Sequence, residues 1–97
     1  MTRLTFSWDP KKAQQNLKKH KVSFQEAVSV FFDENATEYF DEDHSENEDR
    51  FLMLGISFRL RVLVVSYAVH DKARQIRLIS ARKATKNESK AYTWAKS

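Results

Sequence analysis

The 97-residue sequence contains no cysteine, one glycine and one proline. Without cysteine, the chain can form neither a disulfide framework nor a thiolate metal site. A single glycine cannot build the glycine-rich loops that bind phosphate in nucleotide-dependent proteins. No apolar run approaches the roughly 18 residues of a membrane span, and no signal peptide is visible. We therefore expect one small cytoplasmic domain that covers residues 1–97.

The sequence also lacks a metal-binding pattern. His20, His44 and His70 lie far apart, and none belongs to an H-x-x-x-H spacing. The acidic residues between Asp41 and Glu48 are similar to a calcium loop only in charge, because the glycine that such a loop requires is missing. We expect no metal cofactor.

Positive and negative charges are strongly segregated along the chain. Residues 33–49 contain nine acidic and no basic residues, whereas the rest holds all 17 Lys and Arg against four acids. The net charge of +4 therefore conceals a remainder of +13. Such a surface suits a polyanion such as nucleic acid, although ordinary solvation charge gives the same composition. The acidic segment is then a mobile loop, a partner-docking surface or an internal counterion for the arginines.

Three helix starts are marked by capping residues. Asp9-Pro10 is an N-cap followed by proline at the first helical position. Ser23 with Glu26, and Thr85 with Glu88, form S/T-x-x-E capping boxes. The last helix has a weak apolar stripe, so it docks loosely or relies on a partner. These signals predict helices at about 10–19, 24–32 and 86–95.

Alternating or continuous apolar runs predict five strands. The run 61–69 is β-branched and apolar on both faces, which is typical of a central strand covered by helices. Short turns, including a polar one at 70–74, favour antiparallel pairing of the last three strands. The order β-α-α-β-β-β-β-α predicts an α+β fold, with two N-terminal helices and a C-terminal helix packed on a mainly antiparallel sheet. The strands fall at 4–8, 36–40, 51–57, 61–69 and 75–85, the last running almost directly into the final helix.

The last strand carries arginines where a buried face would be apolar. Since side chains alternate along a strand, Arg77 and Arg82, five residues apart, are expected on opposite faces. A buried, unpaired arginine is costly, so each needs a carboxylate partner, an anionic ligand or a path to solvent. The function of this strand depends on which of these three alternatives applies to each arginine.

The charged residues can support RNA cleavage without a metal. RNA is cleaved through its own 2′-hydroxyl when a protein activates that group, stabilises the negative phosphorane and protonates the leaving oxygen. Arginine suits the second task because its planar guanidinium binds phosphate bidentately, and Glu, His, Lys or Tyr can handle the protons. Each candidate could instead have a purely structural role, as a surface charge, a member of an ion pair or a packing residue. The candidates are His44, Glu48, Arg50, Arg61, His70, Arg77, Arg82 and Tyr92.

Several motifs, all in order, resemble one family. Residues 6–13, Phe-Ser-Trp-Asp-Pro-Lys-Lys-Ala, resemble the F-x-W-D-P-x-K-A opening of the BrnT family. Asn16 and residues 19–27 match its N-x-x-K-H-G-V-S-F-x-E-A segment, and residues 44–50 resemble its H-S-x-x-E-D-R stretch. Residues 54–57 and 76–85 match the rest. The resemblance spans residues 6–92, nearly the whole chain.

Membership would imply the toxin of a bacterial type II toxin–antitoxin pair. Such toxins are ribonucleases with a RelE-like fold that arrest growth by cutting RNA, with no metal cofactor. The implied partner is a BrnA-type antitoxin, which neutralises the toxin in a heterotetramer with two copies of each chain. DNA is reached only through the antitoxin, whose DNA-binding region lets the complex repress its own operon.

The sequence departs from the family pattern at three places, which comprise four positions. Lys21 stands where glycine is usual in the second motif, and Leu60 stands where glycine commonly precedes Arg61. Near the end of the central strand, Val69-His70 replaces a frequent Glu-Arg. If that arginine touches RNA in relatives, the histidine replaces it with a weaker, pH-dependent charge.

The first hypothesis is a metal-independent endoribonuclease toxin. Arg77 and Arg82 would bind phosphate and stabilise its transition-state charge, with Arg61 lining the same face. Glu48 or His44 would handle the proton.

His70 is a second candidate for proton transfer. The alternative hypothesis is a non-catalytic module that uses the same basic face for RNA or for an acidic segment of the antitoxin. Such a module would lose affinity gradually as cations are removed, whereas a nuclease has one or two positions where cleavage collapses. Further contacts to RNA are expected from Lys19, Arg50, Lys83 and Tyr92.

Overall fold

The computed structural model describes residues 4–45, 47–70 and 75–96, and most of the predicted polar turn, residues 71–74, lies outside them. The elements are β1 (Thr5–Ser7), α1 (Pro10–His20), α2 (Phe24–Ser29), β2 (Thr37–Phe40), β3 (Arg50–Ile56), β4 (Val62–His70), β5 (Gln75–Lys83) and α3 (Lys86–Lys96), with short 3₁₀ turns at Val30–Phe32 and Glu42–His44. They follow the predicted order, so the α+β fold is confirmed.

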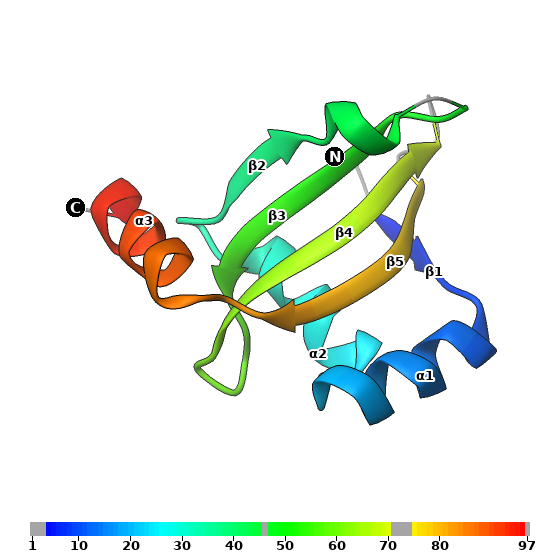
Figure 1. The fold of residues 1–97 in the computed structure, drawn as a ribbon, viewed down its shortest axis with the longest axis horizontal. Helices are drawn as coiled ribbons and strands as arrows, with labels where there is room; N and C mark the ends of the chain where they lie inside the picture. The colour runs from blue at the N-terminus through cyan, green and yellow to red at the C-terminus, as the bar shows by residue number, and fades with distance from the viewer. Residues whose placement is uncertain (1–3, 46, 71–74, 97) are drawn as a thin grey trace.

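The strands form one mixed sheet in the order β1-β5-β4-β3-β2 (Figure 1). β1 runs parallel to β5, and every other neighbouring pair is antiparallel. The long central strand β4 is the one predicted at 61–69. None of the helices in the described part is long and apolar enough to cross a membrane.

Helices α1 and α3 begin where their capping residues predict. Asp9 accepts a hydrogen bond from the backbone N–H of Lys11 at 3.0 Å. At α3 the capping box is complete. The backbone N–H of Glu88 donates to the Thr85 hydroxyl at 3.2 Å, and the Glu88 carboxylate accepts from the Thr85 N–H at 2.8 Å.

The capping box of α2 is only half formed. The Ser23 hydroxyl accepts from the backbone N–H of Glu26 at 3.0 Å, but the Glu26 side chain turns inward and is 1% exposed. The helix predicted over 24–32 ends as an α-helix at Ser29 and continues as a 3₁₀ turn.

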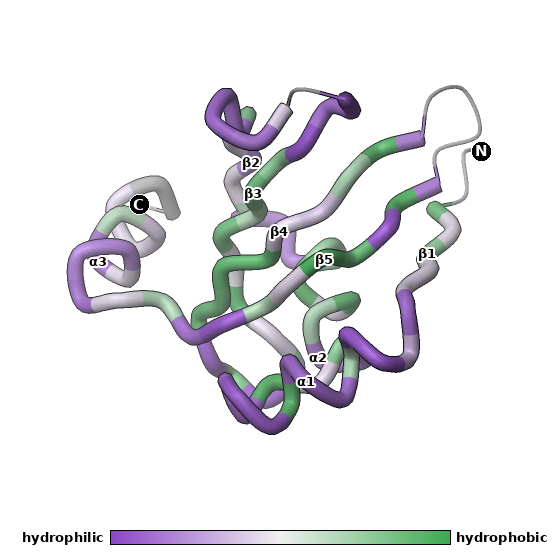
Figure 2. The backbone as a smooth tube through the Cα atoms, turned by 45° about the vertical axis from the view of Figure 1, so that its right-hand side comes forward, coloured by the Kyte–Doolittle hydropathy of each residue, from purple (hydrophilic) through white to green (hydrophobic). Residues whose placement is uncertain are grey.

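Helices α1 and α2 cover one face of the sheet, and α3 covers part of the other. Figure 2 shows α1 as mostly hydrophilic, and β3 and β4 as mostly hydrophobic, so α1 offers little apolar surface to the sheet. A small apolar cluster joins α3 to the sheet, with Tyr92 from the helix and Leu54 and Val64 from the strands. The main core lies under α1 and α2 and comprises Val22, Phe24, Ala27, Val30, Leu63, Val65, Tyr67, Ile76, Leu78 and Ala81.

The two arginines of β5 lie on the same face of the sheet, so the prediction of opposite faces is wrong. Residues paired across neighbouring strands share a face, and Arg77 pairs with Ala68 while Arg82 pairs with Val64. The partners are four residues apart on β4, whereas the arginines are five apart on β5. A β-bulge beside the Ser66/Tyr67 step adds the extra residue and reverses the alternation.

Asn16 on α1 takes the place of a strand partner for β5. β1 pairs with β5 only over residues 75–77, which leaves the edge at Ala81 without a strand. The Nδ2 of Asn16 donates to the carbonyls of Val22 and Ala81, each at 2.9 Å, and its Oδ1 accepts from the Ala81 N–H at 3.0 Å. One buried amide therefore satisfies three backbone groups and ties α1 to the sheet.

Replacing Asn16 with alanine should lower the free energy of unfolding by about 2–3 kcal/mol, because three buried backbone groups lose their partner. Asn16→Asp should be nearly as costly, since a carboxylate cannot donate to the two carbonyls. Urea unfolding measures both. Gln14→Ala, an exposed change on the same helix, is the control. A loss at Asn16 no larger than that of the control would contradict this role.

Lys21 and Leu60 adopt the left-handed conformation, with φ of 60° and 61°. Lys21 follows α1 and its N–H donates to the carbonyl of Leu17 at 2.9 Å. Leu60 lies in the β3–β4 hairpin and its N–H donates to the carbonyl of Ser57 at 2.8 Å. This conformation costs a residue with a Cβ about 1–2 kcal/mol. Glycine, the residue that the family resemblance leads one to expect at both positions, avoids that cost.

Leu60→Gly is expected to raise the free energy of unfolding by about 0.5–1 kcal/mol. This net gain is the backbone strain that glycine relieves minus the cost of the greater conformational entropy that it gives the unfolded chain. Leu60 is 80% exposed, so the change removes little packing. Thermal unfolding measures the effect. Leu60→Ala keeps the Cβ and is the matched control. Equal stability of the glycine and alanine variants would show that the turn stores no strain.

Candidate active site

The face of the sheet opposite α1 and α2 is only partly covered by α3, and we call its uncovered part the open face. Strand register identifies the side chains on it. Arg50 of β3 pairs with Ala68 of β4, which pairs with Arg77 of β5, and the next row contains the pair Ser66 and Ser80. Polar residues that the register places on the open face include Arg50, Ser66, His70, Arg77, Ser80 and Arg82.

Glu48 lies among three cationic or ionisable side chains. Its carboxylate accepts a hydrogen bond from Nη2 of Arg77 and lies 3.6 Å from Nε of Arg50 and 3.9 Å from Nε2 of His70. His70 Nε2 is in turn 3.4 Å from Nη1 of Arg77. The acidic segment thus supplies an internal counterion for arginine, one of the three roles considered for it. We call these four residues the Glu48 cluster.

The cluster keeps Glu48 ionised. The hydrogen bond from Arg77 is the main reason that the pKa of Glu48 is held below its usual range, against the opposing effect of burial. The charges of Arg50 and His70 act in the same direction as Arg77. Glu48 can therefore accept a proton at neutral pH. A ligand anion that took Arg77 from Glu48 would remove the main cause of the shift and make the carboxylate more basic.

Arg82 is held by the first turn of α3. Its Nη1 and Nη2 donate to the two oxygens of Glu88 at 2.8 and 2.9 Å. This pair is the main reason that the pKa of Glu88 falls to about 2. The side chains of Arg77 and Arg82 are 36% and 41% exposed, so both remain open to an anionic ligand despite their carboxylate partners.

His44 lies beside the Glu48 cluster. Its Nδ1 is 3.0 Å from Oδ2 of Asp41, and its side chain is 65% exposed. His44 nevertheless lines a cavity of about 310 Å³ together with Glu48 and Arg50, so it can reach a ligand bound there. Within the described part of the chain, no group of three or more His, Cys, Asp or Glu residues is placed to hold a metal ion.

Arg61 does not line the open face, which corrects the expectation made from the sequence. Its Nε donates to Glu26 at 2.9 Å, and its Nη2 donates to the carbonyl of Lys21 at 3.0 Å, on the side of α1 and α2. The partner that it finds, Glu26, is 35 residues away along the chain. Arg61 is thus a structural residue that joins the β3–β4 hairpin to the helices.

Tyr92 is also internal rather than available to RNA. It lies on the inner side of α3 and is 4% exposed, and its hydroxyl donates to Asp33 at 2.6 Å. Burial, together with that hydrogen bond, raises the pKa of Tyr92 to about 12. Tyr92 is therefore a packing residue, the structural role considered for it as the alternative to catalysis or RNA binding.

Lys19 and Lys83 lie apart from the Glu48 cluster, and Lys83 pairs with Leu63 of the main core, which places it on the α1/α2 face of the sheet. Lys19 lines a groove between α1 and β5 that also includes Ser80, and Lys83 is exposed at the end of β5. Sequence reasoning missed Ser66 and Ser80, whose row lies between that of Arg77 and that of Arg82. Only the pairing register reveals them, because a serine inside an apolar strand carries no functional signal of its own.

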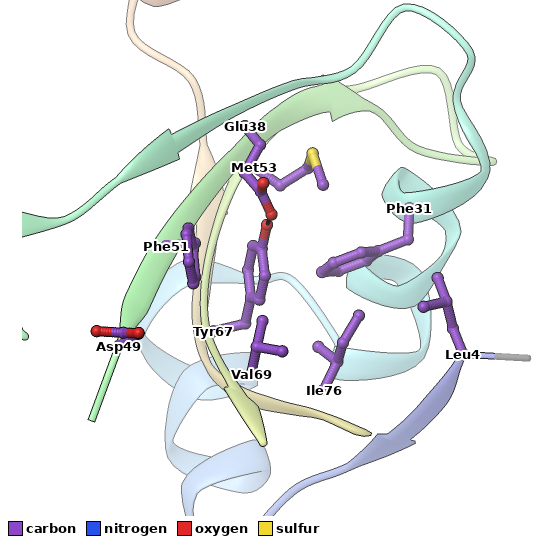
Figure 3. Close-up of a pocket in the computed structure, with 9 residues that line it drawn as sticks. All are labelled: Leu4, Phe31, Glu38, Asp49, Phe51, Met53, Tyr67, Val69 and Ile76. Atoms are coloured by element: carbon purple, nitrogen blue, oxygen red, sulfur yellow. Dashed lines mark hydrogen bonds between the residues drawn. The ribbon is translucent and has the colours of Figure 1, made fainter. Parts of the chain in front are cut away.

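A larger cavity, of about 690 Å³, lies on the α1/α2 side of the sheet. Figure 3 shows Tyr67 within it, between Phe31 and Phe51, with its hydroxyl directed at Glu38. Burial is the main cause that raises the pKa of Tyr67, so the phenol stays neutral and donates. The described residues that line this cavity include the acids Glu38 and Asp49 and no cation, so an anion such as phosphate is better served by the open face.

Comparison with known proteins agrees with this geometry. A family model described as the ribonuclease toxin BrnT of type II toxin–antitoxin systems matches residues 8–88. The crystal structure of the Brucella abortus ribonuclease toxin BrnT is similar, with a TM-score of 0.65, 20% sequence identity, and coverage of 87% of this chain and 100% of that chain, which confirms the fold. No curated protein matches. Because the family model spans most of the chain, including the Glu48 cluster and Arg82, the chain belongs to the BrnT family, the ribonuclease toxins of type II toxin–antitoxin systems, and has an antitoxin as its partner.

Proposed function

We propose that the chain is a metal-independent endoribonuclease that cleaves RNA through the substrate's own 2′-hydroxyl, at the Glu48 cluster. The observation that carries the proposal is the gathering of one carboxylate with two arginines and a histidine on the open face. Metal-free cleavage needs a base, a group that stabilises charge, and an acid. The cluster contains a residue type suited to each task.

The arginines are assigned to the phosphate. Arg77 donates one hydrogen bond to Glu48, and its planar guanidinium can exchange that contact for a bidentate one with phosphate oxygens. The side chain of Arg50 is 32% exposed, so its guanidinium can donate to the same phosphate, although its Nε is enclosed. Arg82 lies at the α3 end of the open face, where it can bind a neighbouring phosphate of the RNA.

The protons are assigned to Glu48 and His70. Glu48 takes the proton from the 2′-hydroxyl, and the 2′-oxygen attacks the phosphorus. The bond from phosphorus to the 5′-oxygen breaks, and His70 donates a proton to that oxygen. The products are a 2′,3′-cyclic phosphate and a 5′-hydroxyl. His44, which lines the cavity beside Glu48, is the alternative proton carrier.

The partner is proposed to be a BrnA-type antitoxin, in a complex with two copies of each chain. Its DNA-binding region would connect the complex to the operon, and the toxin itself would touch DNA only through it. Released in the cytoplasm, the toxin would stop translation and growth by cutting RNA. The description of the family as half of a toxin–antitoxin system supports this assignment.

RNA cleavage by the purified chain, with EDTA present, tests the proposal. We expect products with 2′,3′-cyclic phosphate and 5′-hydroxyl ends, and no cleavage of a 2′-O-methyl RNA of the same sequence. RNA that is bound but left uncut would overturn the enzyme assignment and favour the binding module. Products with 5′-phosphate ends would show that water, rather than the 2′-hydroxyl, is the nucleophile.

The Glu48→Gln variant tests whether Glu48 acts as the base or only as a counterion for the arginines. If Glu48 is the base, kcat should fall by about 100-fold or more, because glutamine cannot accept the proton. Affinity for the 2′-O-methyl RNA should hold or rise, since one negative charge near the phosphate is gone. Asp49→Asn makes the same charge change at an exposed neighbour and should leave kcat unchanged. A faster Glu48→Gln enzyme would mean that Glu48 only masks Arg77.

A further inference from the structure

A recess of about 210 Å³ lies on the same side of the sheet as the arginines, between β2, β3 and β4 and the inner side of α3. Register ties it to the open face. Leu52, in its lining, pairs with Ser66, and Val64, also in its lining, pairs with Arg82. The residues that line it are Tyr39, Leu52, Leu54, Val64, Glu88 and Ala91.

The recess has the size and chemistry to hold one unpaired nucleobase. It is smaller than the ~300–1,000 Å³ of sites for drug-sized ligands, which suits a single flat ring system. Leu52, Leu54 and Val64 offer an apolar surface, and Tyr39, 45% exposed, offers an aromatic ring of the kind on which bases stack. Single-stranded RNA is recognised mainly through such splayed bases.

Glu88 adds a specific polar group to this apolar setting. Its Oε1 accepts from Arg82 and from the backbone N–H of Thr85, but within the described residues its Oε2 accepts only from Arg82. A carboxylate oxygen accepts about two hydrogen bonds, so Oε2 can take one more N–H. An exocyclic amino group, as in adenine, cytosine or guanine, is the base feature that a carboxylate recognises.

The walls of the recess are fixed before any ligand arrives. The Tyr92 hydroxyl under α3 donates to Asp33 at 2.6 Å, and the same carboxylate oxygen accepts from the N–H of Ile56 at 2.9 Å. The Arg82–Glu88 pair holds the first turn of α3 to β5. Because little has to be ordered on binding, even one base contributes measurable affinity.

We propose that this recess binds one amino-bearing nucleobase of the RNA substrate beside the phosphates held by Arg77 and Arg82, and that Tyr39 and Glu88 set the base preference. This inference rests on the proposed ribonuclease site but concerns recognition rather than chemistry. It makes α3 a wall of the substrate site, which explains why a helix with a weak apolar stripe is pinned by two polar contacts.

Ala91→Phe tests the recess by filling it. Ala91 is exposed and lines the recess, so a larger side chain there need not disturb the core. The probes are 2′-O-methyl oligo(A), oligo(C) and oligo(U), which bind without being cut. We expect the wild type to bind oligo(A) and oligo(C) more tightly than oligo(U). In Ala91→Phe the affinity for the first two should fall by about 10-fold and the preference should vanish.

Two further variants complete the test. Asn87→Phe adds the same ring at an exposed position of α3 that does not line the recess, and should behave as the wild type. Tyr39→Leu should also lose about 10-fold in affinity while the slope of affinity against salt stays unchanged, because no phosphate contact is removed. For both Ala91→Phe and Tyr39→Leu, KM for cleavable RNA should rise more than kcat falls.

The outcomes distinguish this inference from the proposed function. Wild-type affinity and preference in both Ala91→Phe and Tyr39→Leu would overturn the recess while leaving the ribonuclease site intact. A wild-type chain with no preference between the three oligonucleotides would overturn the assignment of Glu88. If the chain cuts no RNA but binds it with a base preference that Ala91→Phe abolishes, the result would support the recess and overturn the catalytic proposal.

Discussion

Replacing Arg77 with alanine is expected to lower kcat for RNA cleavage by about 100-fold or more, the loss typical of one donor that stabilises transition-state charge. Arg77 contacts both Glu48 and His70, so the change also removes a contact that positions the proposed base and the proposed acid. With its main hydrogen bond gone, the pKa of Glu48 should move back up. Single-turnover cleavage and binding of 2′-O-methyl RNA, measured side by side, separate chemistry from affinity.

Two controls make the Arg77 result specific. Arg59→Ala removes the same charge from the exposed β3–β4 hairpin, away from the Glu48 cluster, and should change kcat little. Arg77→Lys keeps the charge but loses the planar fork, and should recover only part of the rate. If Arg77→Ala cuts as fast as the wild type, or no more slowly than Arg59→Ala, the phosphate is stabilised elsewhere and the site assignment fails.

The fold was predictable because its signals are local. Helix starts at Asp9 and Thr85 rest on side chains that cap backbone groups two or three residues away, and both are confirmed. The half-formed box at Ser23 shows the limit of such reasoning. The pattern S-x-x-E places Glu26 correctly on the helix, but a partner distant in sequence takes its carboxylate.

The site was less predictable because it depends on register. Alternation along an ideal strand places Arg77 and Arg82 on opposite faces, and one bulge residue brings them to the same face. Nothing in the amino-acid sequence marks that residue. The arginines were recognised as needing partners, but which acid serves each one, Glu48 or Glu88, follows only from the folded chain.

Replacing Arg61 with alanine is expected to lower the free energy of unfolding by about 3–5 kcal/mol, the cost of leaving a buried charge without its partner. Glu26 is 1% exposed, and among the described residues its carboxylate would keep the hydrogen bond from the Ser57 hydroxyl at 2.7 Å after Arg61 is lost. The carbonyl of Lys21 loses its donor as well. Since domains of this kind are stable by roughly 5–15 kcal/mol, the loss is a large share of the total.

A double variant shows whether the loss comes from the charge. Glu26→Met with Arg61→Met replaces both partners by apolar side chains of similar volume, and should recover much of the stability lost in Arg61→Ala. Urea unfolding of the three proteins gives the comparison. A double variant less stable than Arg61→Ala would mean that the ion pair itself, rather than the absence of an unpaired charge, holds the hairpin to the helices.

The pH dependence of the Arg61→Ala variant gives an independent check, because the substitution removes the main cause that lowers the pKa of Glu26. In the wild type, hydrogen bonds from Arg61 are the main cause that holds the pKa of Glu26 below its ordinary value of 4.5, so the stabilisation is complete above that value and is lost as pH falls through the lowered pKa. In the variant the main lowering cause is gone while the effect of burial remains, so the pKa of Glu26 should rise relative to the wild type, and protonation on acidification should relieve the unpaired charge. The stability difference between the two proteins should therefore be largest near pH 7 and shrink toward pH 4. A difference that stays constant over this range would mean that the variant loses packing alone.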